Sequence, residues 1–191
     1  LSTELLAEDS AIEADNRELL NVMRRSQKML FVMIRNILDI EKLRAGKQLQ
    51  LDLADHDLVA LGCQTLDLVR AEAAEKQQLL HFLASVEQLV FRVDKFQFER
   101  VLLNLLSNSL KYTPEEGEIW LHISEKNDAD QPMARIEVID TGIGIPPEEL
   151  PFIFERFRRV ADMEDKVTGT GLGLAITKAL VEEHRSEEHT S

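Results

Sequence analysis

The chain has 191 residues, of which 44% are hydrophobic and 30% charged, an ordinary balance for a soluble globular protein with one core and an appendage. Its 22 basic and 35 acidic side chains give a net charge of −13, which argues against nucleic acid or an anionic membrane surface as a partner. Cys63 is the sole cysteine, so an internal disulfide is excluded and a reducing compartment is expected. The longest apolar run, Met29–Ile34, is too short to cross a bilayer, and no signal peptide is expected at Leu1.

Residues 1–47 are predicted to form part of a dimeric helical bundle. Ser10 and Glu13 have the spacing of a capping box, which predicts a long helix that ends near Ala45, before Gly46. Spacings of four and three alternate along this helix, a heptad pattern carried by Leu19, Met23, Ser26, Leu30, Met33, Ile37 and Ile40. Further apolar residues widen the seam beyond what a pair of helices can bury, which favours a four-helix bundle made by dimerisation. The alternative is that the helix packs on a globular domain of its own chain.

The next part of the chain is predicted to begin the globular domain. Its expected elements are a linker with room for a short strand (47–54), a helix (58–77) and two strands (79–84 and 89–92). Asp55 or Asp57 is expected to cap this helix, and Asp94, followed three residues later by Gln97, is expected to cap the next one.

The helix that follows carries the main functional signal. At about 100° per residue, Asn104, Asn108 and Lys111 fall within one narrow sector. The opposite side carries Leu102, Leu105, Leu106 and Ser109. Asparagine is a mediocre helix former, so two on one face of a leucine-rich helix need a reason. One reason is a solvated face; the other is a site for a hard cation with a positive charge beside it, as magnesium with a nucleotide phosphate requires.

Two glycine-rich turns follow this helix. The expected elements around them are strands at 118–124 and 135–139 joined by a polar loop (125–132), a short helix starting at Pro146, a mobile loop (161–168) and a last helix (171–184). The first turn directly follows the second strand, as Asp140-Thr141-Gly142-Ile143-Gly144-Ile145. The second turn, Thr168-Gly169-Thr170-Gly171-Leu172-Gly173, leads into the last helix. Its spacing matches neither a Walker loop nor a dinucleotide fingerprint.

The asparagine-bearing helix and the two glycine turns, in this order, resemble the asparagine box and the two glycine boxes of the ATP-binding domain of sensor histidine kinases. The resemblance implies an α+β fold over residues 48–184, a two-layer α/β sandwich of the Bergerat type with a mixed sheet packed on helices. It also identifies residues 1–47 as similar to the second helix of the kinase dimerisation domain. The implied reaction is ATP-dependent phosphorylation of a histidine, followed by phosphate transfer to an aspartate on a response-regulator receiver domain.

The family's site residues can be carried over position by position. Asn108 is implied as the magnesium ligand, Lys111 and Tyr112 as neighbours of the phosphates, and Asp140 as a buried carboxylate that reads adenine. Asn104 and Lys111 are the implied catalytic residues, with ATP and magnesium as cofactors. The remaining implied ATP-binding residues are Gly142, Gly144, Ile145, Phe154, Phe157, Gly169, Thr170, Gly171, Leu172, Gly173 and Leu174. Phe154 and Phe157 would form the hydrophobic box of the lid, which is loop 161–168. Packing in the core is the alternative interpretation, and the two can hold together.

Asn104 separates this chain from hydrolysing members of the superfamily, which usually carry a glutamate four residues before the magnesium-binding asparagine. A carboxamide cannot act as a general base near neutral pH, so a kinase is favoured over a hydrolysing ATPase. The other alternative is a non-catalytic, nucleotide-binding regulator that dimerises with a true kinase.

The ends of the chain differ from the family pattern. None of the five histidines has the context of the family's phospho-accepting histidine, so the acceptor is expected to lie before Leu1. Residues 185–191 replace the family's final strand hairpin and are interpreted as a non-native tail. We therefore expect a fragment that binds ATP without autophosphorylating, has no membrane contact of its own and comes from the cytoplasm. An inner-membrane anchor in the parent protein is left open.

Overall fold

The computed structural model describes residues 34, 38, 41, 50–128, 131–158 and 170–188, and the chain divides into two units, Leu1–Gly46 and Lys47–Ser191. In the first unit Ile34, Leu38 and Glu41 are helical and exposed. The predicted cap at Ser10 and the seven-residue heptad seam lie outside the described residues.

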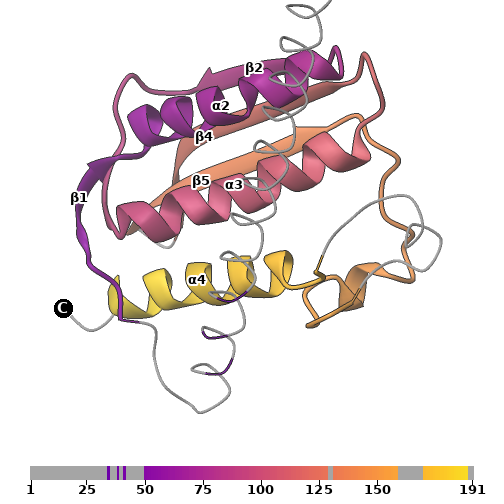
Figure 1. Ribbon diagram of the computed structural model, residues 1–191. Helices are drawn as coiled ribbons and strands as arrows, with labels where there is room; N and C mark the ends of the chain where they lie inside the picture. The colour runs from indigo at the N-terminus through magenta and orange to yellow at the C-terminus, as the bar shows by residue number, and fades with distance from the viewer. Residues whose placement is uncertain are drawn as a thin grey trace, which may run out of the picture. The chain divides into compact units, whose positions relative to one another are not determined.

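The second unit is built on a three-stranded mixed sheet in the order β2-β4-β5, formed by β2 (Leu79–Ala84), β4 (Glu118–Asp128) and β5 (Gln131–Asp140). β4 pairs parallel with β2 and antiparallel with β5. Helices α2 (Leu58–Glu75) and α3 (Lys95–Tyr112) cover one face of this sheet, and α4 (Gly173–Glu188) lies alongside α3 (Figure 1). A separate antiparallel ribbon joins β1 (Ala54–Asp57) to β3 (Val90–Val93), and a short 3-10 helix, η1, covers Leu150–Phe152.

The core lies between the sheet and the two helices. Along β4, Ile119, Leu121 and Ile123 are completely buried, whereas the alternate residues face away from the helices, as the two-residue period of a strand requires. The helices contribute the leucines that meet this face, Leu58, Leu61 and Leu66 from α2 and Leu102, Leu106 and Leu110 from α3. The predicted two-layer α/β sandwich with a mixed sheet is therefore confirmed.

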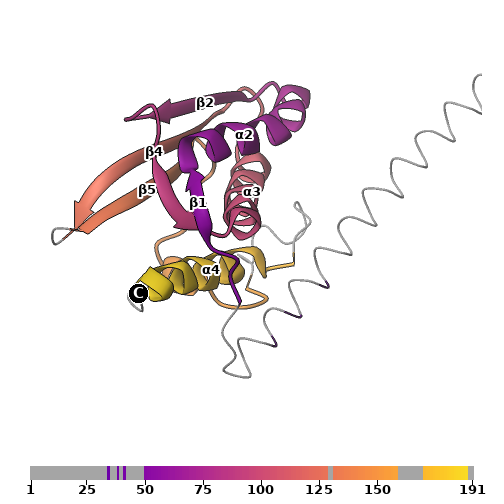
Figure 2. The same cartoon turned by 90° about the vertical axis from the view of Figure 1, so that its left-hand side faces the viewer.

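The predicted loop at 125–132 is wrong, because most of it is strand. The strands β4 and β5 continue beyond Ile123, where the pairing with β2 stops, as a two-stranded ribbon (Figure 2). Glu125 and Lys126 are exposed there, so their polar side chains stay in water while the backbone remains paired with Ala134 and Met133.

Other boundaries differ by a few residues. β1 starts at Ala54, where the linker was expected to end, and η1 takes the place of the short helix expected from Pro146. α4 continues to Glu188 rather than ending at His184, so Arg185–Glu188 of the predicted non-native tail are helical. Within the described residues, no helix combines the length and apolar character needed to span a membrane.

Candidate nucleotide-binding site

The position of α3 is set at its N-terminus and along its buried face. The Asp94 carboxylate accepts a hydrogen bond from the Gln97 backbone N–H over 3.0 Å, which confirms the predicted cap. The buried leucines hold the helix against the sheet, and Asn104, Asn108 and Lys111 lie half-buried on the other side. The helix therefore presents these three polar side chains on one rigid face.

Asn104 joins α3 to the start of α4. Its Nδ2 donates to the Gly173 carbonyl and to Thr177 Oγ1, both over 3.4 Å. α4 is held in place by Leu172, Ile176 and Leu180, which are almost completely buried. The asparagine face and the helix that follows the second glycine turn thus lie side by side, as the predicted site requires.

Asn108 lies one helical turn after Asn104. Among the described residues, no side chain or backbone group hydrogen-bonds its carboxamide. Its side-chain oxygen is therefore available to a ligand that approaches this face of α3.

The first glycine turn is tied to the C-terminal end of α3. Ser109 Oγ donates to Asp140 Oδ2 over 2.8 Å, and the Gly142 N–H donates to Asp140 Oδ1 over 3.0 Å. The Ile143 N–H donates to the Tyr112 carbonyl over 3.3 Å. A Cβ at Gly142 would come within 2.8 Å of that carbonyl oxygen, so packing within the protein requires glycine at this position.

Asp140 is solvent-exposed, and the expectation of a buried carboxylate is wrong. It ends β5, where the chain leaves the sheet, and its two oxygens are oriented by Ser109 and Gly142 rather than by burial. The carboxylate is thus fixed in direction but still open to a ligand, since each oxygen can accept more than one hydrogen bond.

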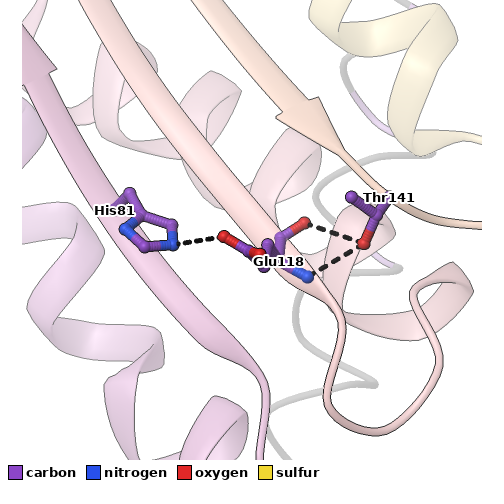
Figure 3. Close-up of polar contacts among 3 residues, drawn as sticks. All are labelled: His81, Glu118 and Thr141. Atoms are coloured by element: carbon purple, nitrogen blue, oxygen red, sulfur yellow. Dashed lines mark hydrogen bonds and ion pairs between the residues drawn. The ribbon is translucent and has the colours of Figure 1, made fainter.

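Thr141, in the first glycine turn, is hydrogen-bonded to the start of β4 (Figure 3). Its Oγ1 accepts from the Glu118 N–H over 2.9 Å and lies 3.5 Å from the Glu118 carbonyl. The Glu118 carboxylate contacts His81 Nε2 over 2.8 Å, and the His81 ring stacks on Trp120 with 5.1 Å between ring centroids. These contacts join the turn to the sheet face opposite the helices.

The second glycine turn is described from Thr170 onward. Thr170 Oγ1 accepts from the Leu172 N–H over 3.3 Å, and the Gly171 carbonyl accepts from the Phe157 N–H over 2.9 Å. Gly171 has a φ of 67°, and a Cβ there would lie 2.8 Å from the Arg158 carbonyl oxygen, so both conformation and space demand glycine. Gly169 and the predicted lid loop (161–168) lie outside the described residues.

Several predicted ligand residues are exposed around these turns. Ile145, Phe154 and Phe157 are 43%, 44% and 68% exposed, so the alternative of core packing for the two phenylalanines is wrong. Lys178 of α4 lies over the Phe154 ring, 5.7 Å from its centroid.

Gly144 has a φ of 71° and no heavy atom within 4 Å of a Cβ built on it. Leu174, in the first turn of α4, is half-buried.

Four positioning residues were missed from the sequence. Ser109 was assigned to the apolar side of α3, although a serine among buried leucines is itself a signal that it has a polar partner. Thr141 and Thr177 were passed over because their partners are backbone groups or distant side chains. His184, for which the sequence predicts no specific contact, accepts at Nε2 from the Asp94 N–H over 3.1 Å, and so holds α4 to the start of α3.

Comparison with known proteins agrees with this geometry. Residues 93–190 match the family model described as histidine kinase-, DNA gyrase B- and HSP90-like ATPase. Over 171 residues the chain is 36% identical to the circadian input-output histidine kinase CikA of Synechococcus elongatus, covering 88% of this chain. The chain spans only 22% of the length of that relative.

Two solved structures share the fold. The catalytic domain of the histidine kinase ThkA superposes with a TM-score of 0.62 at 25% identity, covering 70% of this chain and 82% of that one. Full-length ShkA in complex with AMPPNP gives a TM-score of 0.69 at 28% identity, covering 87% of this chain and 34% of that one.

Proposed function

Because the chain belongs to the family of histidine kinase-, DNA gyrase B- and HSP90-like ATPases, we propose that residues 48–184 bind magnesium-ATP as the catalytic part of a sensor histidine kinase. The observation that carries this proposal is the convergence of the three motifs on α3. Asn104 contacts Gly173, and Ser109 and Tyr112 hold the turn that contains Asp140. One helix thus supports both glycine turns.

The adenine end of the site is formed by Asp140. Its exposed carboxylate can accept a hydrogen bond from the exocyclic amine of adenine, and the contacts from Ser109 and Gly142 set the direction of that bond. The phosphate end lies at the start of α4, whose first backbone N–H groups have no intrahelical partner and attract anions. Lys111, on the same face of α3 as Asn104 and Asn108, supplies a positive charge.

Asn108 suits a magnesium ion that is held mainly by the nucleotide. Magnesium takes oxygen ligands and keeps several waters, so one carboxamide oxygen beside phosphate oxygens is enough protein ligation. Among the described residues there is no cluster of three histidine, cysteine or acidic side chains that could hold a metal. When bound, magnesium would neutralise charge on the phosphates, while Asn108 and Lys111 orient them.

The phosphoryl acceptor and the partners complete the proposal. Asn104 is a carboxamide and does not activate water, which favours transfer to an imidazole over hydrolysis. Of the histidines that the structure describes, His56, His81 and His122 lie in strands, away from the context expected of a phospho-acceptor, and His184 Nε2 accepts a hydrogen bond from the Asp94 N–H. The fifth, His189, lacks that context in the sequence. We infer that the acceptor histidine is outside this chain, that residues 1–47 dimerise, and that a response-regulator receiver domain takes the phosphate. Because ATP is available in the cytoplasm, its use as substrate favours a cytoplasmic location for this part of the protein.

Calorimetry with magnesium-ATP tests the nucleotide site. The unmodified chain is expected to bind only when magnesium is present, and Asn108→Ala is expected to lose that binding. Gln64→Ala, which removes an exposed carboxamide from α2, serves as the matched control and should bind normally. A folded chain that does not bind, or an Asn108→Ala variant that binds as well as the unmodified protein, would refute the proposal.

A further inference from the structure

Gln78, between α2 and β2, is a buried glutamine whose amide contacts the C-terminal end of α3. Its Nε2 lies 2.6 Å from the Thr113 carbonyl, 3.2 Å from the Leu110 carbonyl and 3.3 Å from the Pro114 carbonyl. Lys76 Nζ donates to the same Leu110 carbonyl over 2.7 Å. That carbonyl cannot form its usual helical bond, because the residue four positions later is Pro114, which has no N–H. Two side chains from one turn therefore replace the missing helical donor.

The chemistry of this contact requires a hydrogen-bond donor, which the amide of Gln78 supplies. Three carbonyl oxygens surround one atom of the side chain, so only the NH2 group can face them, and the orientation of the amide is fixed. Gln78 is 5% exposed, and within the described part of the chain its Oε1 has no hydrogen-bond partner. A polar side chain buried with one end unsatisfied is unfavourable for stability by itself. The three contacts of its Nε2 therefore give Gln78 a role in holding the C-terminal end of α3, beyond filling the core.

The segment that Gln78 holds is the one that supports the first glycine turn. The Tyr112 carbonyl accepts from the Ile143 N–H, and Ser109 Oγ donates to Asp140. Thr113, directly bonded by Gln78, donates its N–H to the Ser109 carbonyl over 2.9 Å. A shift of this last helical turn would therefore move the Asp140 carboxylate.

We propose that Gln78 is a positioning residue for adenine recognition. It holds the last turn of α3, which in turn contacts Asp140 through Ser109. The proposal rests on the proposed function, because it assumes that Asp140 accepts the adenine amine. Because Gln78 is 5% exposed, its proposed role is to act through Asp140 rather than by contact with nucleotide or metal. Its expected effect is accordingly confined to the adenine end, with the phosphate end at Asn108 and α4 left unchanged.

The test compares Gln78→Met, which keeps the length of the side chain but cannot donate, with Thr65→Val. Thr65 is buried too and donates to the Leu61 carbonyl within α2, so the control removes a buried hydrogen bond that does not involve α3. Calorimetry would use two probes, magnesium-ATP and magnesium tripolyphosphate. We expect Gln78→Met to bind ATP about tenfold more weakly, the equivalent of one misplaced hydrogen bond, with tripolyphosphate binding unchanged. Thr65→Val should bind both probes normally.

Hydrogen exchange gives a readout that needs no ligand. The Ile143 amide, which is bonded to the Tyr112 carbonyl, should exchange faster in Gln78→Met and at its normal rate in Thr65→Val. Normal ATP affinity in folded Gln78→Met, or an equal weakening of both probes, would overturn the inference. If Gln78→Met does not fold, Lys76→Met takes its place. A weaker affinity for magnesium-ATP, smaller in size and without a change in tripolyphosphate binding, supports the inference, and an unchanged ATP affinity overturns it. Failure of the unmodified chain to bind either probe would instead overturn the proposed function.

Discussion

Replacing Ser109 by alanine tests whether ATP binding depends on the orientation of the Asp140 carboxylate. The serine is 5% exposed, and its hydroxyl donates to Asp140 Oδ2 over 2.8 Å. Without this donor, the carboxylate keeps only the Gly142 N–H as a partner among the described residues, and can rotate away from the position in which we propose that it accepts the adenine amine. We therefore expect Ser109→Ala to weaken ATP binding without removing any atom that touches the nucleotide.

The magnitude follows from the exposure of the two partners. A hydrogen bond to a charged group contributes roughly 1.5–3 kcal/mol when both partners are buried. Asp140 is solvent-exposed, so the Ser109 contact falls below that range, at about 1 kcal/mol, which corresponds to a roughly fivefold weaker affinity.

The assay is a calorimetric titration of Ser109→Ala with magnesium-ATP beside Ser107→Ala. Ser107 lies half-buried on the same helix, and its hydroxyl has no hydrogen-bond partner among the described residues, so its variant controls for the higher helix propensity of alanine. Ser107→Ala should bind as the unmodified chain does. A folded Ser109→Ala variant with unchanged affinity would refute the idea that this hydroxyl orients the carboxylate.

Three further changes have defined outcomes. Asp140→Ala should abolish ATP binding in calorimetry, whereas His122→Ala, on the sheet face opposite the helices, should leave it unchanged. If Asp140→Ala binds ATP as tightly as the unmodified chain, Asp140 does not recognise adenine. Gly171→Ala should lower the melting temperature, because a φ of 67° costs a residue with a Cβ about 1–2 kcal/mol before any clash, and an unaltered melting curve would contradict this. His184→Ala should destabilise the fold to urea by about 1 kcal/mol through loss of the acceptor for the Asp94 N–H; a stability equal to the unmodified chain would show that this contact contributes nothing.

The elements predicted best are those with a strong period and a recognisable boundary. β2 was predicted with the bounds that it has, and α3 was predicted from its cap at Asp94 and its leucine face. The family inferred from three motifs is confirmed by the match over residues 93–190. The hairpin is predicted, but its loop is predicted too long, because the residues after Ser124 are polar. Backbone pairing, which does not depend on side-chain polarity, keeps them in a two-stranded ribbon.

The motifs predict which residues belong to the proposed site, but not how those residues are held. Asn104 and Asp140 were found from residue type and spacing, whereas the contacts that orient them come from Thr177, Ser109 and the backbone of Gly173. Such contacts depend on how segments far apart in the sequence pack, and no local pattern carries that information. The exposure of Asp140 was mispredicted for the same reason, since burial at the end of a strand depends on what packs beyond it.

The contacts of Asn104 give a structural reason for a carboxamide at this position. Its Nδ2 donates to the Gly173 carbonyl, an atom that can only accept. A carboxylate at the same place would face that carbonyl as a second acceptor, so α3 and α4 would lose one of their contacts, and only Thr177 could still donate. The same amide cannot take a proton from water near neutral pH. The carboxamide of Asn104 therefore both joins the two helices and leaves this position without a group that could activate water. Replacing it by a carboxylate would introduce such a base and would also weaken the contact between α3 and α4.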